Sequence, residues 1–373
     1  MALPAGAAAA AAAAESRTFA TEMDFVRAEH TDLRGSEFNP AGRTHSEKAE
    51  LRDRTFVSQE FMVEDARLVP GGIESFQLDT HGFAYMQGVL PPWPPELANP
   101  MDYEFPDFEA AEMPGARAYC PALAEACRKF AGAEAAFVTN YILRNDAVSD
   151  GPGYNVHTHS DFGPWAEGTF RAMLSERYGV PAHVVQEKDL LLVNVWHPFD
   201  RPAYSDPLAL MDMSSMALPT GWEETAAVRR LPIAIDQLAS LGDNDEPSPF
   251  YRSGRFYSLD ADGQQTMKSD DGCLSACPPL PTNRFYYCPD MRPDEAWLFK
   301  QWDTRRDKGA RICFHSAVHD PVYDVQVDGA KALAGLEGRL TSHTVSQMPT
   351  RRSLECRMVM TFSKKAEDSR SKL

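Results

Sequence analysis

Residues 351–362, RRSLECRMVMTF, alternate between two kinds of side chain. Successive side chains of a β-strand point to opposite faces of a sheet, so this pattern predicts a strand with two unlike faces. One face would carry Leu354, Cys356, Met358, Met360 and Phe362, and the other Arg351, Ser353, Glu355 and Arg357. The segment is either an edge strand with a solvated polar face, or a barrel strand whose polar face lines an anion-binding cavity. In the second case Glu355 pairs with one arginine, because buried charges need partners, and the other arginine is left for a carboxylate ligand.

Further short segments rich in β-branched and aromatic residues lie between turn signals, which is typical of strands. The predicted strands are residues 61–67, 74–86, 135–144, 189–198, 296–303 and 310–318. Residues 120–133 and 163–179 are predicted to be helices. Many spaced strands after a helical section favour a mainly β fold with flanking helices (α+β), in which a β-barrel or jelly roll forms the core.

The chain of 373 residues, 43% of them hydrophobic, is long enough for one large globular domain. Residues 1–50 are Ala-rich and then polar, and we expect a partly disordered arm there. Residues 51–365 are expected to form a single domain, with an irregular polar insertion at about residues 240–284. No run of apolar residues has the length of a membrane span, and the N-terminus lacks the pattern of a signal peptide.

The charge balance excludes some partners. Lys and Arg number 37 and Asp and Glu 54, so the net charge is 37 − 54 = −17, which opposes binding to nucleic acid and to an anionic membrane. We expect a small-molecule partner, and no pattern indicates an oligomeric state.

The odd count of seven cysteines favours free thiols. The tail, residues 366–373, ends in Ser-Lys-Leu, which predicts a peroxisomal address in a eukaryotic cell and a cytoplasmic protein otherwise.

A candidate metal site begins at His159-Ser160-Asp161, where an imidazole and a carboxylate point the same way on an extended segment. A histidine from a distant strand would complete two histidines and one carboxylate, the set that leaves three positions open on Fe(II) for a co-substrate and O₂. His315 lies in the most strand-like context for this role, whereas His319 follows in a predicted loop. His157 is expected to support the ligands or to be a satisfied core or surface histidine.

The polar face of the last strand completes the candidate site. Arg351 and Ser353 follow the distal histidine, and this Arg-x-Ser arrangement suits the distal carboxylate of 2-oxoglutarate. Arginine presents a planar fork to the carboxylate and serine adds a hydroxyl.

Six segments resemble the GA4 desaturase / AsaB-type hydroxylase–desaturase family, which also includes CmcJ-like proteins. They are residues 63–83, 156–162, 190–212, 284–303, 313–318 and 351–362, of which 284–303 is the most specific. The resemblance implies a double-stranded β-helix (cupin-like) core and a non-haem Fe(II)/2-oxoglutarate-dependent dioxygenase. Such an enzyme uses O₂ to hydroxylate or desaturate a small molecule of secondary metabolism by ferryl hydrogen abstraction.

The resemblance also implies roles for individual residues. The iron ligands would be His159, Asp161 and His315. The 2-oxoglutarate contacts would be Arg351 and Ser353, with Arg357 either supporting them or facing the substrate. The pocket-lining residues would be Asn194, Trp196 and Lys300.

Two departures from the family pattern bear on the substrate. His197 stands where the family usually has arginine, so His197 is a further candidate for substrate contact. His315 and Arg351 are 351 − 315 = 36 residues apart, more than is usual in the family, which predicts a second insertion at residues 320–349.

Two other functions are compatible with parts of this pattern. A cupin-like metal-dependent hydrolase or isomerase could use the same triad with water in the open position. A non-catalytic partner protein of a biosynthetic enzyme would need no triad at all. Arg351-x-Ser353 argues against the first alternative, and the intact triad argues against the second.

Overall fold

The computed structural model describes fourteen stretches of the chain: residues 18–26, 56–94, 114–145, 158–162, 166–199, 201–203, 206–215, 250–253, 257–259, 265–267, 273–276, 283–305, 308–320 and 351–364. The alanine tract, His157, the second predicted insertion after residue 320 and the tail with its Ser-Lys-Leu end lie outside the described residues.

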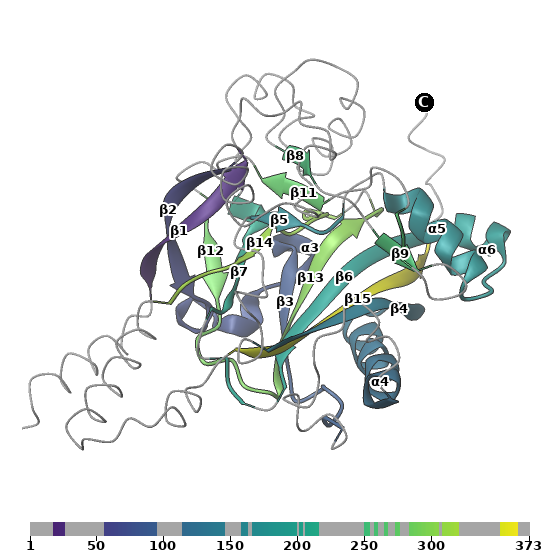
Figure 1. Ribbon diagram of the computed structural model, residues 1–373, viewed down its shortest axis with the longest axis horizontal. Helices are drawn as coiled ribbons and strands as arrows, with labels where there is room; N and C mark the ends of the chain where they lie inside the picture. The colour runs from purple at the N-terminus through teal and green to yellow at the C-terminus, as the bar shows by residue number, and fades with distance from the viewer. Residues whose placement is uncertain are drawn as a thin grey trace, which may run out of the picture.

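Two β-sheets form the centre of the molecule (Figure 1). The eight-stranded sheet contains, in spatial order, β1 (Phe19–Val26), β2 (Phe56–Asp65), β12 (Phe285–Tyr287), β7 (Leu208–Met211), β14 (His315–Ala317), β5 (His159–Ser160), β11 (Cys273–Ala276) and β8 (Phe250–Ser253). The five-stranded sheet contains β3 (Phe83–Gln87), β13 (Glu295–Asp303), β6 (Lys188–Pro198), β15 (Arg352–Ser363) and β4 (Ala135–Asn145). Strands β9 (Tyr257–Leu259) and β10 (Gln265–Met267) pair separately.

Short helices accompany the sheets. They are α3 (Leu78–His81), α4 (Pro114–Ala131), α5 (Ala166–Glu176) and α6 (Ala182–Gln186), with single 3₁₀ turns at η2 (Ala66–Leu68), η3 (Ile73–Ser75) and η7 (Met213–Ser215). This arrangement is the double-stranded β-helix, or jelly-roll, core with flanking helices that the sequence predicts. None of the described helices has the length and apolar character needed to cross a membrane.

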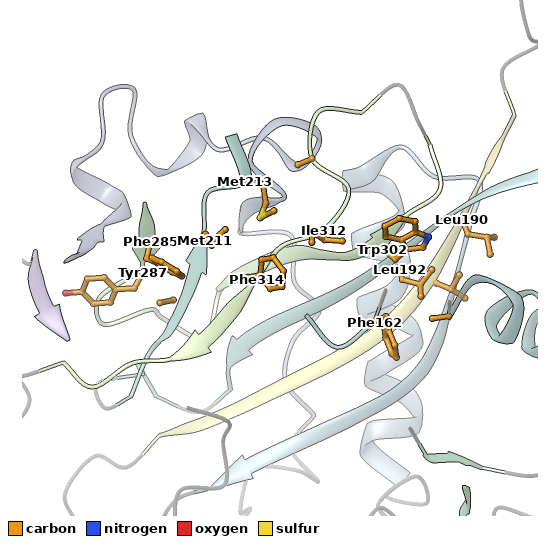
Figure 2. Packing of buried hydrophobic residues seen from close by; sticks show 14 of the residues in the cluster. Phe162, Leu190, Leu192, Met211, Met213, Phe285, Tyr287, Trp302, Ile312 and Phe314 are labelled. Atoms are coloured by element: carbon orange, nitrogen blue, oxygen red, sulfur yellow. The ribbon is translucent and has the colours of Figure 1, made fainter. Parts of the chain in front are cut away.

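The inner faces of the two sheets share a hydrophobic core. Leu190, Leu192 and Trp302 from the five-stranded sheet belong to the same buried cluster as Met211 and Phe285 from the eight-stranded sheet (Figure 2). Burying one such side chain contributes about 1.5–3 kcal/mol to folding. The polar residues described below are therefore set into an apolar interior.

The outer face of the five-stranded sheet is covered by α4. Leu123 and Cys127 of this helix pack with Val195 of β6 and with Leu354 and Cys356 of β15. The apolar face predicted for the last strand is therefore confirmed. Since β15 lies between β6 and β4, the alternative of a solvated edge strand is wrong.

The structure differs from the sequence predictions in several segments. Of the predicted strand 310–318, only His315–Ala317 is a strand. Residues 19–26, inside the predicted arm, form β1, because Phe19 and Met23 are buried on one face of a strand that pairs with β2. Residues 74–86 are not one strand: η3 and α3 precede β3, and α3 ends at Gly82, whose φ of +87° is left-handed. The segment predicted as irregular, about 240–284, contributes β8, β9, β10 and β11.

Gly82 sits at a point where two segments meet closely. Its carbonyl oxygen accepts a hydrogen bond of 2.8 Å from the backbone N–H of Lys300. A Cβ atom on Gly82 would lie 2.5 Å from the carbonyl oxygen of Ile312, which is backbone and cannot turn aside. Gly88 has a comparable φ of +68°, but a Cβ atom there would meet nothing within 4 Å.

We therefore expect Gly82→Ala to destabilise the protein more than Gly88→Ala. A left-handed alanine costs about 1–2 kcal/mol at either position. At Gly82 the steric clash adds about 1–3 kcal/mol. Urea unfolding of the two variants and the wild type measures the difference, and equal losses would show that the close approach to Ile312 does not matter.

Candidate metal centre

Three side chains converge between the sheets. His159 in β5 and His315 in β14 are direct partners across the strand pair, with ring centroids 4.4 Å apart. Asp161 follows two residues after His159, and its Oδ1 lies 3.6 Å from His159 Nε2. One ligand atom from each of the three residues lies within 4.8 Å of the others, and all three residues are buried. Among the described residues this is the only such group of histidine, cysteine or acidic side chains.

The protonation states in this cluster suit metal binding. Burial by itself would raise the pKa of Asp161, but the charge of Arg357 and a hydrogen bond from His159 outweigh burial and hold that pKa well below its usual value. Burial, with some help from His159, lowers the pKa of His315 to about 4, so its imidazole is neutral at neutral pH. Two imidazoles and one carboxylate are ligands that Fe(II) accepts, and the set leaves positions open for other ligands. The residues present therefore fit a divalent iron ion.

Both oxygens of the Asp161 carboxylate accept hydrogen bonds from the five-stranded sheet. The Nδ2 group of Asn194, in β6, donates to Oδ2 at 2.5 Å. The Nη2 group of Arg357, in β15, donates to Oδ1 at 3.0 Å. In addition, the backbone N–H of Asp161 donates to Gln301 Oε1 at 2.6 Å. These contacts fix the rotation of the carboxylate relative to the two histidines.

The two donors to Asp161 also meet at a second carboxylate. Glu355 Oε1 accepts from Asn194 Nδ2 at 3.0 Å and from Arg357 Nε at 3.0 Å. Asp161, Asn194, Glu355 and Arg357 therefore form a closed cycle of hydrogen bonds, which we call the carboxylate ring. The prediction that Glu355 pairs with one arginine of its strand is confirmed, and the arginine is Arg357.

The other arginine, Arg351, lies immediately before β15, two residues from Ser353. Arg351 Nε donates to Ser353 Oγ at 3.2 Å, and Nη1 donates to the carbonyl oxygen of Asp206 at 2.9 Å. The guanidinium carbon lies 5.2 Å from the ring centroid of Trp196. The structure therefore brings together Arg351, Ser353 and Trp196, which the sequence nominated for 2-oxoglutarate and the pocket.

Two residues of this site were missed in the sequence. Phe299 of β13 packs its ring edge-on against His315 with centroids 4.8 Å apart. Gln301, also of β13, accepts hydrogen bonds from Ser160 and Asp161. Both lie in the segment 284–303, and Phe299 pairs across the sheet with Asn194. Paired residues share a face of the sheet, so this pairing places Phe299 beside Asn194, but no pattern within either segment gives the pairing.

Other nominated residues lie apart from the cluster. His197 is on the opposite face of β6 from Asn194, where its Nε2 lies 3.0 Å from the hydroxyl of Tyr119 in α4 and burial lowers its pKa to about 4. His197 therefore lies between the five-stranded sheet and α4, and not between the two sheets. His319 is exposed and lies beside Asp206, so it is not a member of the cluster.

Lys300 is engaged in a buried ion-pair network. Its ammonium group contacts Asp303 Oδ2 at 2.6 Å, Asp79 Oδ1 at 2.9 Å and the carbonyl oxygen of Ala310 at 2.9 Å. The side chains of Lys300 and Asp303 are fully buried. All three donor positions of the ammonium are occupied, so the structure gives Lys300 a role in joining β13 to α3.

Comparison with known proteins adds a family to this geometry. The model of the oxidoreductase/YMDC permease-like domain matches residues 23–234 and 262–361, most of the chain. The chain belongs to this oxidoreductase family. By sequence the chain is similar to the hydroxylase/desaturase efuI of Hormonema carpetanum, with 34% identity over 103 residues, covering 26% of this chain and 32% of that protein. The resemblance to hydroxylase–desaturase proteins, seen in the sequence motifs, is confirmed.

Two further comparisons extend this result. Aspirochlorine biosynthesis protein N of Aspergillus oryzae is 27% identical over 166 residues, covering 42% of this chain and 54% of that protein. The chain thus spans a third to about half of the length of these two relatives. Among solved structures, the iron and alpha-ketoglutarate-dependent endoperoxidase NvfI superposes with a TM-score of 0.60 at 17% identity, covering 94% of this chain and 100% of that chain. This likeness confirms the double-stranded β-helix fold.

We expect Lys300→Ala to lower the free energy of unfolding by about 1–3 kcal/mol, because the buried carbonyl oxygen of Ala310 would lose its donor and Asp303 would keep only Arg305 as a cation partner. Lys308, which pairs with Asp79 and is partly exposed, is the matched control. Lys308→Ala is expected to cost less than about 1 kcal/mol. Chemical denaturation measures both, and a stable Lys300→Ala variant would return Lys300 to the list of candidate substrate contacts.

Proposed function

We propose that this protein is a non-haem Fe(II)/2-oxoglutarate-dependent dioxygenase that hydroxylates or desaturates a small, secondary-metabolite-like molecule. The observation that carries the proposal is the convergence of His159, Asp161 and His315, with Arg351 and Ser353 on the same inner sheet face as the residues that hold Asp161. The names of the relatives, a hydroxylase/desaturase and an iron and alpha-ketoglutarate-dependent endoperoxidase, support the same chemistry.

Each group of residues has a distinct task in this proposal. His159, Asp161 and His315 would hold Fe(II). Bound together with 2-oxoglutarate, the iron would supply the activation of O₂ and the oxidation of a C–H bond, chemistry that side chains alone lack. The carboxylate ring keeps Asp161 turned toward the histidines while both of its oxygens stay hydrogen-bonded.

Arg351 and Ser353 would bind the distal carboxylate of 2-oxoglutarate. A guanidinium and a hydroxyl 3.2 Å apart offer neighbouring donors to a carboxylate. Trp196 lies beside the guanidinium, and the backbone of Asp206 holds one of its nitrogens, so Arg351 is oriented before the co-substrate arrives. Phe299 shields His315 from water on one side.

The cofactor pair can be tested without the substrate. Under anaerobic conditions, addition of Fe(II) and then 2-oxoglutarate to the purified protein should produce a weak visible charge-transfer band. A chelator should remove the band, and His159→Ala should never develop it, because one metal ligand is missing. Iron binding without the band would favour the metal-dependent hydrolase or isomerase, and absence of iron binding would refute the metal site.

Arg351→Ala should weaken 2-oxoglutarate binding much more than Fe(II) binding. A hydrogen bond to a charged group contributes about 1.5–3 kcal/mol, so the dissociation constant of 2-oxoglutarate should rise roughly 10- to 100-fold. Arg128→Ala, on the outer helix α4, is the control and should change neither constant. Titration of the charge-transfer band measures the 2-oxoglutarate constant, and an unchanged value would remove Arg351 from this role.

A further inference from the structure

We propose that Glu355, which is not one of the metal-binding side chains, is a positioning residue that sets the affinity of the site for a divalent metal. It would do so by offsetting the positive charge of Arg357 and by holding Asn194 against Asp161. The inference rests on the proposed function, since it assumes a metal at His159, Asp161 and His315.

The first argument is the geometry of the carboxylate ring. A single oxygen, Glu355 Oε1, accepts from both side chains that donate to Asp161. One of these donors reaches Asp161 Oδ2 and the other reaches Oδ1. Glu355 therefore holds in place the donors to both oxygens of Asp161. In this way it fixes the rotation of the Asp161 carboxylate, which aims Oδ1 at His159.

The second argument concerns the orientation of the Asn194 amide. Asn194 is fully buried, and its Nδ2 group donates to two carboxylates at once. A flipped amide would place its carbonyl oxygen against two carboxylate oxygens, where neither contact could be a hydrogen bond. The hydrogen bond to Glu355 thus favours the same amide orientation as the hydrogen bond to Asp161, with Nδ2 toward both carboxylates.

The third argument is electrostatic. The guanidinium of Arg357 lies 3.0 Å from Asp161 Oδ1, the same oxygen that faces His159, so its positive charge opposes a metal dication there. Glu355 lies 2.9 Å from the same guanidinium nitrogen, so its negative charge offsets that positive charge. The side chains of Arg357 and Glu355 are only 13% and 6% exposed, so solvent screens these interactions weakly.

A double-mutant cycle on metal affinity tests the proposal. Fe(II) binding to wild type, Glu355→Gln, Arg357→Gln and the double variant would be measured by anaerobic calorimetry, with the Co(II) absorption spectrum as a second readout. Glu355→Gln removes the carboxylate that shares the Arg357 guanidinium with Asp161, and it should weaken binding roughly 10- to 100-fold. Arg357→Gln should bind at least as tightly as wild type. The double variant, with both charges removed, should return to within about threefold of wild type.

Matched variants separate this role from a general loss of structure. Glu355→Asp keeps the charge and should retain more metal affinity than Glu355→Gln. Glu295→Gln removes another buried carboxylate, one that pairs with Arg67 and Tyr85, and should leave metal affinity unchanged. If Glu355→Gln does not fold, Asn194→Ser tests the ring from its other side and should weaken metal binding about tenfold.

The outcomes are distinct. Unchanged affinity in Glu355→Gln, or in Asn194→Ser where that variant is used, overturns the inference and leaves the proposed function standing. A double variant as weak as Glu355→Gln overturns the charge-compensation role. A wild-type protein that binds neither Fe(II) nor Co(II) refutes the proposed function itself.

Discussion

Charge that is buried between two β-sheets must be paired within the protein, and this requirement organises the centre of the molecule. An isolated buried ion costs several kcal/mol, so each one needs opposite charge and hydrogen bonds. The structure meets the requirement twice. The carboxylate ring pairs Asp161 and Glu355 with Arg357 and Asn194, and the network at Lys300 pairs that ammonium with Asp79 and Asp303. The two solutions differ in kind. The Lys300 network also includes Arg305 and Lys308 and so has three cations for two carboxylates, whereas the ring has two carboxylates for one guanidinium.

The extra carboxylate distinguishes the carboxylate ring from the ion pairs at Lys300. Two carboxylates and one guanidinium leave the ring with one uncompensated negative charge, next to imidazoles of which His315 is neutral. A cation bound beside Asp161 would therefore balance the charge of the ring. At Lys300 the balance is already complete without a ligand, which agrees with its burial and its three occupied donor positions.

Much of the site followed from the sequence because strand periodicity is a local property. The alternation of residues 351–362 placed Arg351, Ser353, Glu355 and Arg357 on one face, and the structure has them there. The spacing of His159 and Asp161 likewise put two ligands on one side of an extended segment. These inferences needed only the period of two and the rule that buried charges are paired.

Other features depend on contacts between distant segments, which periodicity does not contain. The pairing of Arg357 with Asp161 is set by how β15 faces β5 across the interior. His197 could have been placed on the outer face by counting from Asn194, but only α4 shows what it meets there. β1 was missed because a short amphipathic strand inside a polar stretch is stable only through its partner, β2.

The position of β15 has a consequence for how such a chain can change. Its register is held on one side by β6 and on the other by β4, over most of its length. A shift of this register by one residue would turn Leu354 and Cys356 to the inner face and Glu355 and Arg357 to the outer face. An inserted residue within the strand would therefore disrupt both faces. The chain between β14 and β15 is not part of this pairing, and its length can drift without moving Ser353, Glu355 or Arg357. A change in the length of that connection would therefore leave the same side chains of β15 facing the interior.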